Sequence, residues 1–142
     1  MKWVILAVRD GTTLEDFRSA LSPQFRTLVS EESRSITTRS ESDIHSYVCI
    51  HHCSDEAVSY DEPHELEALR AFSDNPQFYL ANYCEIDFLR DVLSQLVQGV
   101  EMIIDDDYGI IEDGKAFCSR WLENPDWDFV AEFARKGSGM QE

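Results

Sequence analysis

The sequence is poor in basic residues and in glycine. It has 12 Lys and Arg against 28 Asp and Glu, a formal net charge of −16. Nucleic acids need a basic surface on the proteins that bind them, and anionic membranes attract the same charge. The six glycines form no phosphate-binding loop, and no nucleophile elbow is present. The composition therefore argues against nucleic-acid and membrane binding. It favours a cationic partner, a divalent cation or solubility alone.

Long apolar runs are also missing. The run from residue 3 to residue 8 is too short for a signal-peptide core or a membrane span, and Arg9 and Asp10 follow it. The four cysteines lie in apolar surroundings, at Cys49, Cys53, Cys84 and Cys118. Without a leader segment, we expect these thiols to be reduced and mostly buried, in a cytoplasmic protein.

The hydrophobic pattern predicts one α+β domain over residues 1–136, followed by a disordered tail at 137–142. Strands are expected at 2–8, 25–29, 44–53 and 78–83, and helices at 14–21 and 63–72. Thr12 and Glu15 match a capping box for the first helix. This order predicts a ferredoxin-like, split βαβ core with the strands at 2–8 and 44–53 in its centre. A mixed sheet of another order is the alternative.

The region from residue 85 onward is expected to be a helix–hairpin–helix addition to that core. A helix over 86–97 is followed by Gly99, which suits the position just after a helix. Apolar residues at 102–104 and 110–111 flank an acidic turn and predict a hairpin. Asp113 is a plausible N-cap for the last helix.

The acidic turn holds Asp105, Asp106 and Asp107, with Glu112 close behind. Carboxylates could bind Mg²⁺ or Ca²⁺, but the spacing does not match an EF-hand loop. A solvated hairpin turn that faces a basic partner needs no metal. We therefore expect a partner-binding surface here, with no metal and no cofactor.

Histidine and cysteine alternate along the strand at 44–53, and their shared parity would place them on one face: His45, Cys49, His51 and Cys53. The first and last would lie roughly 26 Å apart, so one zinc ion cannot bind all four. His51 and Cys53 could instead join Cys84 or Cys118 in a metal site, and Cys84 with His51 or His52 could form a nucleophilic pair. The competing interpretation is a buried strand whose cysteines pack in the core.

Aromatic and acidic residues interleave near the end of the chain, at Trp121, Glu123, Asp126, Trp127, Asp128 and Phe129. Such a pattern could be an interface patch for a cationic partner, or the two tryptophans could anchor the last helix. Charge is uneven along the chain. Residues 1–40 carry six basic and five acidic side chains, whereas residues 41–142 carry six basic and 23 acidic. This asymmetry favours a partner-facing acidic surface in the later part.

The stretch DDDYGIIEDGKAFCSRWLENPDWDF resembles the C-terminal signature of small bacterial proteins from polymorphic-toxin and contact-dependent-inhibition loci. The matching positions are Asp105, Asp106, Asp107, Gly109, Gly114, Phe117, Arg120, Pro125, Asp126 and Trp127. The resemblance implies an immunity protein, which binds and neutralises a cognate toxin.

The leading hypothesis is accordingly an acidic protein-binding module, an immunity protein for a basic toxin, with a nuclease as one candidate. Its expected partner-binding residues are Asp105, Asp106, Asp107, Glu112, Asp126, Trp127 and Asp128. The protein is expected to be a monomer or a homodimer, without catalytic residues. The alternatives are a small metal- or Cys-dependent enzyme, and a structural or regulatory homodimer subunit.

Overall fold

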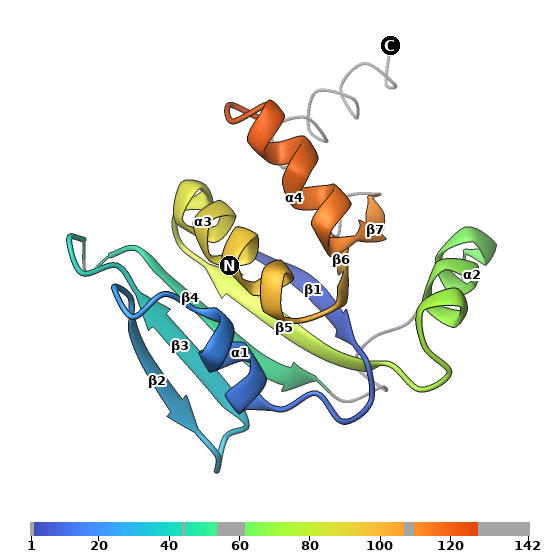
Figure 1. Ribbon diagram of the computed structural model, residues 1–142, viewed down its shortest axis with the longest axis horizontal. Coiled ribbons are helices and arrows are strands. Elements are labelled where there is room, and N and C mark those ends of the chain that lie inside the picture. Colours follow the sequence, from blue (N-terminus) through green and yellow to red (C-terminus); the bar gives the residue numbers. More distant parts are fainter. Residues whose placement is uncertain (1, 44, 54–61, 107–109, 128–142) are drawn as a thin grey trace.

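A seven-stranded antiparallel sheet organises the computed structural model, which describes residues 2–43, 45–53, 62–106 and 110–127 (Figure 1). Its strand order is β2-β3-β4-β5-β1-β6-β7. In chain order, the elements are β1 (Lys2–Val8), α1 (Leu14–Ala20), β2 (Arg26–Ser30), β3 (Ser35–Arg39), β4 (Tyr47–Cys53), α2 (Pro63–Phe72), β5 (Gln77–Tyr83), α3 (Ile86–Gly99), β6 (Met102–Asp105), β7 (Ile111–Asp113) and α4 (Gly114–Glu123). The predicted α+β class is confirmed.

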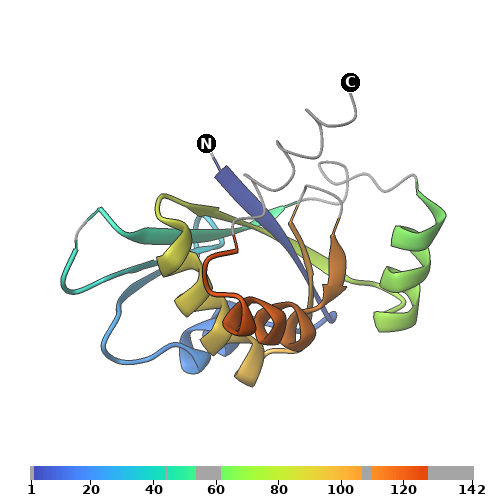
Figure 2. The same cartoon turned by 90° about the horizontal axis from the view of Figure 1, so that it is seen from above.

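Three helices, α1, α3 and α4, lie on one face of this sheet, as Figure 2 shows. Alternate residues of β1, such as Val4, Leu6 and Val8, have no exposed surface and join the main core beneath these helices. The six buried residues of α3 repeat with helical spacing and contribute to the same core. Apolar residues alternate along the strands and repeat about every 3.6 residues along the helices, and the packing of these two apolar surfaces accounts for this layer.

The other face of the sheet carries a smaller apolar cluster near α2. It combines Ala7, Cys53, Leu69, Phe78 and Ile103. Leu69 is the buried residue of α2, so this helix packs with the side chains of β1, β4, β5 and β6 that face away from α1, α3 and α4. None of the helices in the described part of the chain is long and apolar enough to span a membrane.

The region from residue 85 is not an addition outside the core, because β6 is hydrogen-bonded to β1 within the sheet. Both strands expected at the centre are interior strands, but β5 lies between β1 and β4 and occupies the middle of the order. Long-range pairing decided this position, since every one of these strands is apolar enough to be interior. The expected tail at 137–142 lies outside the described residues.

Two local predictions are displaced or wrong. The capping box of α1 uses Thr13 and Asp16 rather than Thr12 and Glu15. The Thr13 Oγ1 accepts from the Asp16 amide at 3.2 Å, and the Asp16 Oδ2 accepts from the Thr13 amide at 2.8 Å. Gly99 is not the residue after the helix but the last residue of α3. A Cβ at Gly99 would lie 2.8 Å from the Cβ of Ala20, so glycine allows α1 and α3 to approach closely.

Candidate functional site

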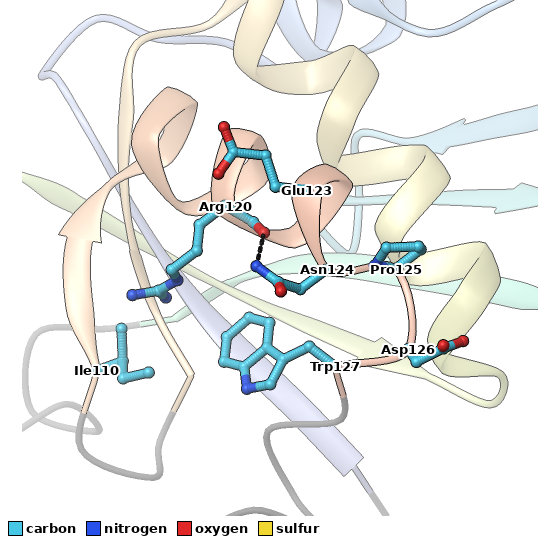
Figure 3. Close-up of a pocket in the computed structure, with 7 residues that line it drawn as sticks. All are labelled: Ile110, Arg120, Glu123, Asn124, Pro125, Asp126 and Trp127. Carbon is cyan, nitrogen blue, oxygen red and sulfur yellow. Dashed lines mark hydrogen bonds between the residues drawn. The ribbon is translucent and has the colours of Figure 1, made fainter.

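An open hollow of about 690 Å³ lies where α4 ends (Figure 3). Its lining comes from the last turn of α4, the four residues after it and the residue before β7: Ile110, Arg120, Glu123, Asn124, Pro125, Asp126 and Trp127. Three of these, Glu123, Asp126 and Trp127, belong to the aromatic-acidic set singled out in the sequence. The hollow is therefore the place where that stretch meets solvent.

Hydrogen bonds to backbone carbonyls hold the turn that lines the hollow. The Asn124 amide donates to the carbonyls of Arg120 and Trp121, and its side-chain Nδ2 donates to Arg120 O at 3.1 Å. The Trp127 amide then donates to Asn124 O at 2.9 Å. From α3, Arg90 Nη1 donates to Pro125 O at 3.0 Å. These bonds close the end of α4 and fix the direction in which the chain leaves it.

Three aromatic rings join this turn to the core. Phe117, Trp121 and Trp127 meet edge to face, with ring centroids 5.5 to 5.9 Å apart. Trp121 is 1% exposed, whereas Trp127 is partly buried and also lines the hollow. The tryptophans therefore anchor the end of α4, which is one of the two interpretations of the aromatic-acidic pattern in the sequence. Trp127 still presents part of its ring to the hollow.

Arg120 lies between the ring of Trp127 and a carboxylate. Its guanidinium carbon is 4.9 Å from the Trp127 ring centroid, and its Nη2 is 2.6 Å from Glu112 Oε1. The two side chains form an ion pair, in which Arg120 is 41% exposed and Glu112 is 28% exposed. Glu112 therefore neutralises the cation in the hollow. The sequence hypothesis included Glu112 but not Arg120 among the partner-binding residues.

The acidic turn differs from the expected solvated turn. Asp105 and Asp106 are 7% and 1% exposed, so a partner cannot reach them directly. Asp106 Oδ1 accepts from the Ile110 amide at 3.0 Å, and the Asp106 amide donates to Ile110 O at the same distance. The Asp106 carboxylate is thus the acceptor for the Ile110 backbone donor, which is the physical reason that it turns inward. Asp107 and Asp128 lie outside the described residues.

The accessible carboxylates near the hollow are Glu123 and Asp126 on its rim, with Asp87 and Asp91 on α3. Figure 3 shows the Glu123 and Asp126 side chains well apart from each other, at different edges of the hollow that Trp127 lines. Asp87 and Asp91 lie 3.6 and 3.7 Å from Arg90, and their side chains are 79% and 57% exposed. Glu123 was not among the expected partner-binding residues. Its place four residues before Trp127 was the available signal.

Asp113 has a structural role beside the hollow. Its Oδ2 accepts from the Ala116 amide at 3.2 Å, as an N-cap of α4, which confirms the sequence prediction. The next residue, Gly114, is packed so closely that an added Cβ would lie 2.8 Å from Met102 Cγ and 2.9 Å from Val97 Cγ1. Cap and close packing together set α4 against α3 and β6.

The His/Cys set does not assemble as one group. His45 precedes β4, Cys49 and His51 are half-buried, and Cys53 is buried. His51 Nδ1 lies 3.4 Å from Asn82 Nδ2, and the Thr37 hydroxyl donates to Cys49 Sγ at 3.4 Å. Across the described part of the chain, no three His, Cys, Asp or Glu side chains are grouped as metal ligands.

The four cysteines are free thiols with different exposure. Cys53 and Cys118 are buried, Cys49 is half-buried, and Cys84 is exposed, which corrects the expectation for Cys84. Burial raises the pKa of Cys118 to about 11, so its thiol stays protonated and unreactive at neutral pH. Cys84 follows the last residue of β5, where the chain leaves the core.

No protein-family model, curated protein or solved structure matches this chain.

Proposed function

We propose that this chain is an acidic protein-binding module, a cytoplasmic immunity protein that binds and neutralises a basic toxin domain. The observation that carries the proposal is the hollow at the end of α4, which a partly buried tryptophan lines together with two exposed carboxylates. The resemblance of the 105–129 stretch to immunity proteins of bacterial toxin loci supports the same function. A nuclease domain is one toxin of suitable charge, because nucleases need a basic surface for phosphate.

The hollow suits a cationic side chain of the partner. Glu112 neutralises Arg120, so Glu123 and Asp126 leave a net negative rim. The aliphatic part of a lysine or arginine would pack on the exposed part of Trp127, while its charge meets the rim carboxylates. Asp87 and Asp91 extend the acidic surface along α3 and would steer the approach of a basic partner.

We also propose that the scaffold is a ferredoxin-like core, in the connectivity β1-α1-β4-β5-α3-β6. In the observed order, β5 lies between β1 and β4, and β1 lies between β5 and β6. Each helical crossover therefore joins two strands with one strand between them, which supports the proposed split βαβ arrangement. The β2–β3 hairpin is then an insertion after α1, α2 lies within the β4–β5 connection, and β7 with α4 follows the core.

The test begins with growth. The proposal predicts that a gene beside the one for this chain encodes a basic toxin domain. That domain should stop bacterial growth when expressed alone, and co-expression of this chain should restore growth. Failure of rescue by a well-expressed chain that also shows no binding to the purified domain would refute the proposal.

Binding kinetics then test the site. The double variant Glu123→Gln, Asp126→Asn should slow association about threefold to tenfold at low salt, and less at high salt, because steering by exposed charges is screened. The matched control, Asp10→Asn with Glu41→Gln, removes the same two charges from exposed positions on other segments. Equal effects of the two double variants would mean that net charge acts, rather than this hollow.

A further inference from the structure

We propose that the outer edge of β2 is a self-association surface, which pairs antiparallel with β2 of a second copy of this chain. β2 is the last strand at its end of the sheet, and its five residues pair on one side with β3 (Figure 1). Within the described ranges, no further strand pairs with its other side. An edge strand presents backbone donors and acceptors that can hydrogen-bond to another strand.

β2 has few of the features that block strand addition. Its sequence, RTLVS, contains no proline, and its pairing with β3 runs through five consecutive residues without a bulge. Leu28, its middle residue, is 74% exposed, the highest value among the large hydrophobic residues that the structure describes as exposed. In an antiparallel pair centred on Leu28, the two Leu28 side chains meet across the two-fold axis and become shielded from water.

The charges around β2 favour this partner and this direction. Arg26 begins the strand, and Glu31 and Glu32 directly follow its end; all three are exposed. Antiparallel pairing places Arg26 of each copy beside the two glutamates of the other. Parallel pairing would place like charges together. The edge is therefore complementary to itself, which argues for a second copy rather than an unrelated partner.

The location also avoids the acidic excess of the chain. Residues 24–40 contain three arginines and two glutamates, so two copies can approach here without strong repulsion. The opposite edge is different, because β7 has only three residues and Asp113 at its end caps α4. A five-residue strand pair buries a small interface, so we expect a weak, concentration-dependent dimer.

Sedimentation equilibrium tests the proposal. The average mass of the wild-type protein should rise with concentration from 16.4 kDa towards twice that value. Leu28→Lys should raise the dimer dissociation constant at least about tenfold, because a charged edge residue opposes strand addition. The control Leu122→Lys makes the same change on α4, where Leu122 is 59% exposed, and should dimerise as wild type does. Far-UV circular dichroism should be unchanged in both variants.

A charge exchange tests the direction of pairing. Arg26→Glu and Glu32→Arg should each weaken the dimer, and the two changes combined should restore it. A wild-type mass that stays at 16.4 kDa up to about 1 mM overturns the proposal, as does equal behaviour of the two lysine variants. A double charge variant weaker than either single variant would exclude the antiparallel pair. None of these results bears on the hollow, which lies at the other end of the sheet.

Discussion

The two hairpins at the ends of the sheet use their charged residues in different ways. In the β2–β3 hairpin, exposure alternates along β2, and Arg26, Glu31, Glu32 and Arg39 are exposed. In the β6–β7 hairpin, all four residues of β6 are buried, including Asp105, and so is Asp106 that follows. The densest acidic stretch of the sequence is thus partly interior. A high density of carboxylates along a chain does not by itself make an acidic surface.

The two hairpins also differ in the local partners of their charged residues. α4 begins directly after β7 and packs on α3 and β6, and three carboxylates at that end have local partners: Asp106 accepts from the Ile110 amide, Asp113 caps α4, and Glu112 pairs with Arg120. At the other end, α1 packs beside β2 and β3, and Thr27 and Thr38 share a hydroxyl hydrogen bond of 3.1 Å. The charged residues there remain in water.

The largest difference between the two ends should come from their apolar residues. Trp121→Ala should lower the free energy of unfolding by about 3–5 kcal/mol, because it removes the largest fully buried side chain and its contacts with Phe117 and Trp127. Leu28→Ala should change it by less than about 0.5 kcal/mol, since Leu28 is exposed. Urea unfolding of dilute protein measures both. Similar losses in the two variants would remove the contrast between the ends.

A smaller effect should separate two aspartates of the same acidic region. Asp106→Ala should cost about 1–3 kcal/mol, because the Ile110 amide loses its acceptor on the buried Asp106 side chain. Asp126→Ala should stay within about 0.5 kcal/mol, as Asp126 is an exposed residue on the rim of the hollow. Equal unfolding midpoints for the two variants would show that the inward turn of Asp106 has no energetic role.

The smallest effect should appear as a pH dependence at the junction of β1, α2 and β6. A hydrogen bond from Arg9 at 2.7 Å holds the pKa of Glu101 below its ordinary value of 4.5. A lowered pKa contributes stability above the unfolded-state pKa, and this contribution is lost as the pH falls through the lower folded-state value. Glu101→Gln should therefore melt slightly below wild type near neutral pH, and the difference should shrink as the solution is acidified.

The matched control for that experiment is Asp10→Asn, an exposed neutralisation next to Arg9 in the sequence. Its melting temperature should follow wild type at each pH. A Glu101→Gln difference that grows on acidification would contradict the assigned sign.

Most of the local structure could be predicted from the sequence. Strands near 2–8 and 78–83, helices near 14–21 and 86–97, and the Asp113 cap depend on neighbouring residues, and the structure has them within a few residues. The hollow was only partly predictable. Trp127 and Asp126 were expected from the aromatic-acidic pattern, but Arg120 and Glu123 were not among the expected partner-binding residues, because their place in the hollow depends on how α4 packs.

The sequence alone determined the α+β class, because hydrophobic periods of two and 3.6 residues are local properties of the chain. Only the tertiary structure decided that β5 lies at the centre, that β6 pairs with β1, and that Asp105 and Asp106 are interior. Several strands are apolar enough to take a central position, so their order depends on which long-range pairings form together. The burial of a carboxylate likewise depends on which elements pack around it, and those contacts exist only in the tertiary structure.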